Sequence, residues 1–463
     1  MLLELKEKLT VEDLYHGNFG IEREGLRVTQ EGKLADTPHP EVFGDKLKNP
    51  FITTDFSESQ IEMITPVCQT INQVHHSLAS LYHQTIKGLQ RKEYLWPQSM
   101  PCLLEEKQVV PIAHFTSDEE GRALMAYRKL LLDKYGAKKQ LISGIHYNFS
   151  FSETLLKKLF LERGASQSYQ LFKDQVYLKI VRQYLRYRWL LIYFLGASPV
   201  IDTSYLSECK APLKQIARDS FSYEGAISFR NSSDGYQNKV PIYVDYKDVK
   251  SYVRSLQTYI DKQTLFSYKE FYSPIRLKAR DPQHFMDSLK KEGISYLEIR
   301  SIDLNPFEPL GISKMDLQFI HLFILFLLES EEVEVETWQQ EANFNTEQIA
   351  REGRRSSLRL KRMGEEILMT EWALEILNKM KQINDTFGLY QGVTIDQKIN
   401  QLCSPEETIS GKVVELMKHS SYLDLNLSLA RRYKENLRYH LVLGKKVKAV
   451  DLGNENEPAL NLK

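Results

Sequence analysis

The nine residues GIEREGLRV (20–28) alternate as a β-strand does, but they place carboxylates where a strand normally buries apolar side chains. In an extended chain, successive side chains point to opposite faces. Glu22 and Glu24 therefore share a face with Leu26, whereas Arg23 points to the other face and is expected to be structural. Because an unpaired buried carboxylate is strongly disfavoured, this segment is either an irregular surface edge or one wall of a site that holds a cation.

Three further strand-like segments show the same peculiarity. They are TTDFSESQIEMITP (53–66) with Asp55 and Glu62, SGIHYNFSF (143–151) with His146, and YLEIRSID (296–303) with Glu298 and Arg300. Taken singly, each has an ordinary explanation, because a lone strand histidine is usually structural and alternate glutamates usually form a solvated face. Taken together, several carboxylates and one imidazole at apparent core positions require cations. A ligand set this rich in oxygen suits Mg²⁺ or Mn²⁺ better than Zn²⁺.

Ions of this kind usually bridge to phosphate oxygens, which indicates nucleotide chemistry. The sequence contains no GxxxxGK[ST] motif and no GxGxxG motif after a strand, so the usual glycine-rich phosphate loops are missing. Phosphate contacts would then come from metal ions and arginines. Arg230, Arg276 and Arg300 lie in strand or strand-edge contexts and are available for this role.

Helical patterns separate the strand-like segments. Apolar residues recur at intervals of three and four over 71–92, 118–136 and 169–199, and the last stretch is long enough for two helices or one bent helix. From about residue 309 the chain is mostly helical and highly charged. Since strands and helices do not alternate regularly, the pattern favours an α+β fold with an antiparallel sheet over a doubly wound one.

Two segments of the second half have ordinary interpretations. FIHLFILFLL (319–328) is too short to span a bilayer and contains His321, so it predicts a buried helix. The basic segment REGRRSSLRLKR (351–362) is interpreted as a solvated helix face or a loop, and covering the sheet is favoured over touching a nucleotide.

Charge and cysteine usage exclude several classes of protein. Lys plus Arg and Asp plus Glu are both 61, which gives no bulk electrostatic argument for binding nucleic acid or an anionic membrane. The four cysteines are Cys68, Cys102, Cys209 and Cys403. They are widely separated, without the spacing of metal ligands or of a redox motif. Free thiols of this kind suit a reducing cytoplasm, and the first ten residues lack the apolar core of a secretion signal.

Seven segments taken together, and in this order, resemble glutamate–cysteine ligase of the bacterial type, the first enzyme of glutathione synthesis. They are GIEREGLRV, TTDFSESQIEMITP, YRKLLLDKYG, LISGIHYNFSF, FLGASP, SFRNSSDGYQNK and YLEIRSIDLNPF, between about residues 15 and 310. The resemblance implies a curved antiparallel sheet of about six strands, lined by metal ligands and surrounded by helices, as in the glutamine synthetase catalytic domain. It also implies a reaction in which ATP phosphorylates the γ-carboxylate of L-glutamate and the amino group of L-cysteine then displaces phosphate.

The resemblance also implies roles for individual residues. The metal ligands would be Glu22, Glu24, Asp55, Glu62, His146 and Glu298, with Mg²⁺, or alternatively Mn²⁺, as the ion and ATP as co-substrate. Arg300 matches a residue that stabilises the transferring phosphate, and Arg128 matches a residue that binds a substrate carboxylate. The cysteine pocket maps onto Phe56, Tyr127, Leu131, Gln140, Arg230, Tyr236 and Tyr272. A small pocket with aromatic walls discriminates against larger amino acids mainly by size.

We expect one catalytic domain over 1–463, with a core at about 15–330 and a helical part at about 331–463 packed on it. Some relatives add an ATP-grasp domain that completes glutathione, but the sequence reaches Lys463 without one, so only the first step is expected. The expected partners are glutamate, cysteine and ATP, with no nucleic acid and no membrane, and the expected state is a cytoplasmic monomer or weak dimer.

Two alternatives stay open at this point. The same fold could use another amine acceptor, or the chain could be a non-catalytic homologue. All six metal-ligand positions hold competent residues, which a catalytically dead homologue need not maintain. A metal-dependent nuclease is disfavoured because the neutral net charge gives no electrostatic footprint for nucleic acid.

Overall fold

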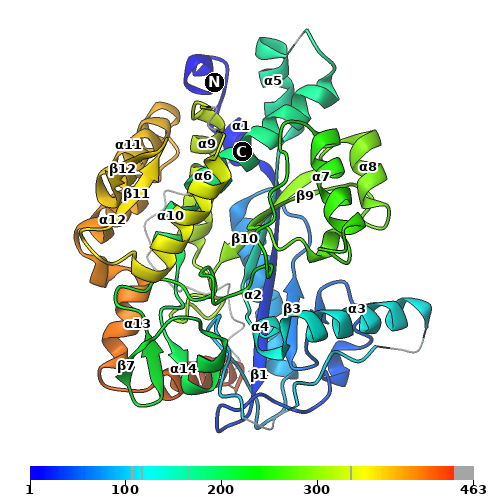
Figure 1. Ribbon diagram of the computed structural model, residues 1–463, viewed down its shortest axis with the longest axis vertical. Coiled ribbons are helices and arrows are strands. Elements are labelled where there is room, and N and C mark those ends of the chain that lie inside the picture. Colours follow the sequence, from blue (N-terminus) through cyan, green and yellow to red (C-terminus); the bar gives the residue numbers. More distant parts are fainter. Residues whose placement is uncertain (106–108, 116–117, 165, 334–335, 443–463) are drawn as a thin grey trace.

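A seven-stranded antiparallel sheet forms the centre of the computed structural model, which describes residues 1–105, 109–115, 118–164, 166–333 and 336–442. The strand order is β2–β3–β1–β5–β10–β9, and the short β4 pairs with the end of β1 (Figure 1). The strands are β1 (Gly17–Val28), β2 (Ile52–Thr54), β3 (Gln60–Ile64), β4 (Tyr94–Leu95), β5 (Ile145–Phe151), β9 (Ile275–Lys278) and β10 (Tyr296–Ile302). This confirms the predicted α+β fold with an antiparallel sheet.

The register of β1 brings the unusual polar residues together. Glu22 lies opposite His146 of β5, and Glu24 lies opposite Glu62 of β3. Directly opposed residues of an antiparallel pair project from the same face, so these side chains gather on one side of the sheet. Arg23 lies on the other side, as predicted, with its guanidinium 5.8 Å from the centre of the Tyr82 ring.

The opposite face of the sheet is apolar and carries the main core. Tyr147 and Phe149 of β5 are fully buried there, together with side chains of helices α6 (Tyr169–Leu195) and α9 (Lys314–Glu329). Helix α6 runs without interruption, so the alternative of two helices is wrong. Every residue of 319–328 in α9 is buried, so the predicted buried helix is confirmed. Within the described parts of the chain, no helix is long and apolar enough to cross a membrane.

Further helices surround the sheet (Figure 1). They are α1 (Val11–Tyr15), α2 (Ile71–Gly88), α3 (Glu119–Tyr135), α4 (Ala137–Gln140), α5 (Glu153–Arg163), α7 (Val249–Asp261), α8 (Phe285–Glu292), α10 (Trp338–Glu352), α11 (Met369–Phe387), α12 (Gly392–Cys403), α13 (Ile409–Met417) and α14 (Tyr422–Val442). A small sheet has the order β6 (Ile201–Asp202), β8 (Ser220–Ser222) and β7 (Lys214–Ala217). Among residues 336–442, α10 packs on α6 and α11 on α9, whereas 443–463 of the predicted helical part lie outside the described residues.

Two local predictions were wrong. The strand-like segment 143–151 becomes a strand only at Ile145, because Ser143 and Gly144 belong to the short connection after α4. The second half of REGRRSSLRLKR is not helix or loop but strand β11 (Arg359–Arg362), which pairs with β12 (Glu365–Leu368). The two turn residues, Met363 and Gly364, both have positive φ, as a tight two-residue hairpin requires. Methionine rarely adopts that conformation, so the turn left no recognisable pattern.

His321 is the one titratable side chain of the buried run in α9. It packs against the rings of Phe19 and Phe149, and its Nε2 donates a 2.6 Å hydrogen bond to the carbonyl of Leu14. Burial lowers the pKa of this imidazole to about 4, from an ordinary value of 6.5. The folded protein therefore holds His321 neutral at pH values where the unfolded chain protonates it.

We expect this histidine to make the fold sensitive to acid. Since the pKa is lower in the folded state, stability is lost as the pH falls from 6.5 to 4, by at most about 3 kcal/mol. His321→Phe removes the group, so its free energy of unfolding in urea should fall less steeply over this interval than that of the wild type. The exposed His76→Gln is the control and should keep the wild-type slope. Equal slopes for His321→Phe and the wild type would contradict the assignment.

Candidate active site

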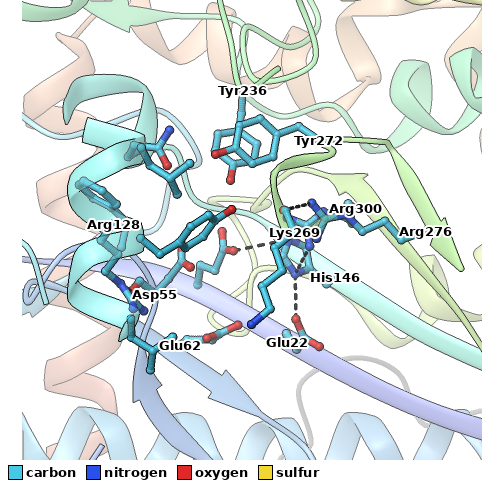
Figure 2. Close-up of a pocket in the computed structure, with 16 residues that line it drawn as sticks. Glu22, Asp55, Glu62, Arg128, His146, Tyr236, Lys269, Tyr272, Arg276 and Arg300 are labelled. Atoms are coloured by element: carbon cyan, nitrogen blue, oxygen red, sulfur yellow. Dashed lines mark hydrogen bonds and ion pairs between the residues drawn. The ribbon is translucent and has the colours of Figure 1, made fainter. Parts of the chain in front are cut away.

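A cavity opens over the carboxylate-bearing side of the sheet, with about 770 Å³ of empty space when its open mouth is included (Figure 2). Every predicted site residue except Glu298 and Arg230 lines it. The predicted residues in the lining are Glu22, Glu24, Asp55, Phe56, Glu62, Tyr127, Arg128, Leu131, Gln140, His146, Tyr236, Tyr272 and Arg300.

His146 is the centre of the polar cluster. Its Nδ1 lies 2.9 Å from Glu22 Oε2 and 3.6 Å from Glu298 Oε1, and its Nε2 lies 3.4 Å from Glu24 Oε1. Asn148, the next residue on the same face of β5, donates a 2.9 Å hydrogen bond to the other oxygen of Glu22. The alternation of β5 thus supplies two groups that orient carboxylates of β1.

The cluster has the composition of a divalent-metal site. Two groups of residues each offer three potential ligand atoms, and within each group these atoms lie within 4.8 Å of one another. One group is Glu22, His146 and Glu298, and the other is Glu24, Glu62 and His146. Asp55 lines the cavity but belongs to neither group. Carboxylate oxygens with a single imidazole fit a hard cation such as Mg²⁺.

The carboxyl groups of the cluster do not share one electrostatic environment. Burial raises the pKa of Glu62 well above its ordinary value, and the charges of Glu22 and Asp55 raise it further. Burial also raises the pKa of Glu24. Burial would raise the pKa of Glu22 as well, but the hydrogen bond and charge interaction with His146, together with the charge of Lys278, lower it below its ordinary value. Raised carboxyl pKa values indicate negative charge that protein cations do not balance, as expected where a metal ion binds.

Glu298 and Arg300 form a buried ion pair beside this cluster. Arg300 Nη1 lies 3.0 Å from Glu298 Oε1, and Lys278 Nζ lies 3.2 Å from Oε2. Burial alone would raise the pKa of Glu298, but these two cations hold it well below its ordinary value. Glu298 itself does not line the cavity, but both of its neighbours His146 and Arg300 do. It therefore reaches the site through the groups that it contacts.

Arg230 is buried next to the cavity rather than in its wall. It donates a 2.6 Å hydrogen bond to the carbonyl of Arg300 and lies 4.0 Å from Asp303. Its guanidinium packs so closely on Gly144 that a Cβ there would lie 2.2 Å from Nη2. Arg230 thus supports the backbone that carries Arg300.

The opposite wall comes from α3 and two loops. Arg128 of α3 donates a 2.7 Å hydrogen bond from Nε to the carbonyl of Asp55 and stacks on Phe115. The rings of Tyr236 and Tyr272 have centroids 4.4 Å apart. Aromatic rings and one arginine therefore face the metal-competent cluster across the cavity (Figure 2).

Sequence reasoning missed part of the lining. Arg276 had been singled out only as an available arginine; it donates hydrogen bonds to the carbonyls of Phe271 and Lys269, and it lines the cavity. Leu124 and Lys269 were not predicted at all. Lys269 is exposed, and Figure 2 shows its ammonium pointing toward the carboxylate cluster. It lies outside any period-2 strand pattern, so only its position three residues before Tyr272 could have drawn attention to it.

The chain is similar in sequence to a known family of proteins. The model of the family described as glutamate–cysteine ligase matches residues 2–349. The glutathione biosynthesis bifunctional protein GshAB of Clostridium perfringens is 38% identical over 447 residues, which cover 94% of this chain and 56% of the relative. Its namesake from Listeria welshimeri is 42% identical over 454 residues, which cover 96% of this chain and 58% of the relative. The chain thus spans somewhat more than half the length of these curated relatives.

Solved structures give a similar result. Glutamate–cysteine ligase of Francisella tularensis in complex with AMP has a TM-score of 0.85 and 29% identity, and covers 92% of this chain and 89% of its own. A bifunctional glutathione synthetase from Pasteurella multocida has a TM-score of 0.80 and 32% identity, with 94% of this chain and 54% of the other chain covered.

We expect the carboxylate cluster to destabilise the protein unless it binds cations. Mg²⁺ with nucleotide should raise the melting temperature, and chelation should lower it. Because the pKa of Glu62 is higher in the folded state, its contribution to the stability of the metal-free protein should fall as the pH rises above 4.5, the ordinary pKa of this group.

Glu62→Gln should therefore melt about 2 °C or more above the wild type in EDTA at pH 8, yet gain less from Mg²⁺ with nucleotide. The exposed Glu366→Gln serves as the control and should respond as the wild type does. Identical melting curves for the wild type with and without Mg²⁺ and nucleotide would contradict a shared metal site.

Proposed function

Because the chain belongs to the glutamate–cysteine ligase family, we propose that it uses ATP to join the γ-carboxylate of L-glutamate to L-cysteine, giving γ-glutamylcysteine, ADP and phosphate. This is the first step of glutathione synthesis. One observation carries the proposal: a single cavity holds a carboxylate–imidazole cluster with Arg300 on one side and an aromatic wall with Arg128 on the other. Phosphoryl transfer and recognition of a small amine acceptor need these two sets of groups side by side.

The reaction has two chemical steps. A γ-carboxylate oxygen of glutamate attacks the terminal phosphorus of ATP, and ADP leaves with the electrons of the broken P–O bond. The amino group of cysteine then attacks the carbonyl carbon of γ-glutamyl phosphate; the C–O bond breaks, phosphate leaves and the amine loses a proton. Both steps bring anionic groups together, so the site must neutralise charge and align the reactants.

Divalent cations would neutralise the phosphate charge in this site. The residues that would hold them are Glu22, Glu24, Asp55, Glu62, His146 and Glu298. Arg300 supports this work with a fixed positive charge. Burial alone would lower the pKa of Arg300, but its acidic neighbours, Glu298 first among them, together raise it above its ordinary value, so the guanidinium stays protonated at any working pH. The hydrogen bond from Arg230 fixes its backbone, so Arg300 is held ready to contact the transferring phosphoryl group.

The aromatic side of the cavity suits the amino-acid substrates. Arg128 is fixed by Asp55 and offers its guanidinium to a substrate carboxylate. Tyr272 and Gln140 bring a hydroxyl and an amide group to this side of the cavity. The amine acceptor would occupy the space among these groups and the rings of Phe56, Tyr127 and Tyr236, with Leu131 at its edge. A pocket walled by rings admits a thiol side chain and excludes larger ones by size.

The choice of amine is tested with a panel of substrates. Purified protein with ATP, Mg²⁺ and glutamate should release phosphate much faster with cysteine than with alanine, glycine or serine. Phosphate release that is no faster with cysteine than with alanine would show a ligase of the same fold with a different acceptor. Absence of ATP-dependent turnover with every amine would favour a non-catalytic homologue.

We expect Arg300→Lys to lower kcat roughly 100-fold, because lysine keeps the charge but loses the planar guanidinium that reaches both Glu298 and the phosphoryl group. Binding of cysteine should change little, so its KM should stay within about threefold of the wild-type value. Arg280→Lys, an exposed arginine paired with Glu292, is the matched control and should keep wild-type kinetics. Full activity of Arg300→Lys in folded protein would refute the phosphate-binding role.

A further inference from the structure

Helix α10 does not line the cavity, but its last turns hold the loop that carries Tyr236. Arg351 Nη2 donates a 2.7 Å hydrogen bond to Ser233 Oγ and lies 3.1 Å from Asp234 Oδ2. Glu347, one turn earlier, accepts hydrogen bonds from the backbone nitrogen and the hydroxyl of Ser233, at 2.7 and 2.8 Å. Arg351 and Glu347 also pair with each other at 2.5 Å. Two charged side chains of α10 therefore form hydrogen bonds and an ion pair with two consecutive loop residues.

The contact with Asp234 matters for stability because this residue is completely buried. Its other partners are the hydroxyl of Tyr223 and the backbone nitrogen of Lys210, which donates a 3.1 Å hydrogen bond. In the described parts of the chain, Arg351 is the one cation within ion-pair distance of Asp234. Removing Arg351 would leave a buried carboxylate without a counter-charge, which is strongly disfavoured.

The loop is tight enough to transmit a displacement of Asp234 to the cavity. The backbone nitrogen of Gly235 donates to the carbonyl of Ser232 at 3.0 Å, and that of Tyr236 donates to the carbonyl of Arg230 at 3.2 Å. A Cβ at Gly235 would lie 2.2 Å from the carbonyl oxygen of Arg230, so the turn has no spare room. One end of the loop thus supports Arg300 through Arg230, and the other end places Tyr236 against Tyr272.

The end of α10 fixes the preceding chain as well. The carbonyl of Ala350 accepts hydrogen bonds from the backbone nitrogens of Ile227 and Ser228, at 2.9 and 3.1 Å. Arg354 donates from Nε to the carbonyl of Ala226 at 3.0 Å. The segment leading into the loop is therefore anchored to the same helix end, while Arg351 and Glu347 supply the side-chain contacts with the loop itself.

We propose that Arg351 and Glu347 are positioning residues that fix the 230–236 loop and thereby set the shape of the amine-acceptor pocket. Arg351 is the first residue of the basic segment 351–362 and lies just beyond the residues that the family model matches. Its side chain holds the pocket wall from outside and does not touch the substrates. Only the identity of the amine rests on the proposed function; the mechanical role of α10 does not.

The test combines hydrogen–deuterium exchange with steady-state kinetics on the full chain. In Arg351→Ala, the amides of 230–236 should exchange about 10-fold faster, whereas those of β1 and β5 should keep wild-type rates. The KM for cysteine should rise about 10-fold, while kcat and the KM for ATP change less than about threefold. Arg351→Lys keeps the charge without bridging Ser233 and Asp234 together, so it should show an intermediate effect.

Arg355→Ala is the matched control, since this arginine follows α10 and is exposed, and its ion pairs within the described residues are with Glu352 and Glu224. It should leave loop exchange and kinetics unchanged. If Arg351→Ala proves globally unfolded, Glu347→Ala must show the local exchange effect by itself. Wild-type exchange in the loop of a folded Arg351 or Glu347 variant overturns the proposal. If the wild type shows no cysteine-dependent turnover, the proposed function fails, and loop exchange still decides the positioning role.

Discussion

The register of β1 between β3 and β5 is the constraint on which the rest of the site depends. It sets Glu22 opposite His146 and Glu24 opposite Glu62, so one face of the sheet carries nearly all of the charged groups. A slip of one residue would turn these carboxylates into the apolar core and bring Ile21 and Arg23 to the cavity. Such a slip would raise the free energy of the fold on both faces of the sheet, so the observed register is strongly favoured.

The clustered carboxylates repel one another and so oppose folding. Burial of apolar side chains on the other face of the sheet offsets this repulsion. Tyr147 and Phe149 alternate with His146 and Asn148 along β5, so each polar group of the cavity has an apolar neighbour that anchors the same strand in the core. Helices α6 and α9 cover that face with fully buried side chains. The rigid apolar layer holds the carboxylates close together, although they repel one another in the absence of a cation.

Much of this site was predictable because its residues follow the local period of a strand. Alternation alone separated Glu22 from Arg23 and His146 from Tyr147, and the structure confirms both separations. The resemblance then supplied residues that no period marks, such as Tyr236. Lys269 and Arg351 escaped prediction for a different reason. Lys269 reaches the cavity from a turn outside the sheet, and Arg351 contacts the loop that carries Tyr236 from α10. Both placements depend on long-range packing that sequence periodicity does not encode. The β11–β12 hairpin was missed because Met363 occupies a backbone conformation that its side chain rarely adopts.

The order of the strands also sets how the sheet is built during synthesis. Strand β5 pairs with β1 on one side, but its other side waits for β10, which the ribosome reaches only after residues 152–295. At common rates of translation this interval lasts on the order of ten seconds, during which IHYNFSF has an unpaired edge. Its aromatic, uncharged pattern favours pairing with other chains. The edge of β5 is therefore most open to pairing with other chains before β10 has been synthesised.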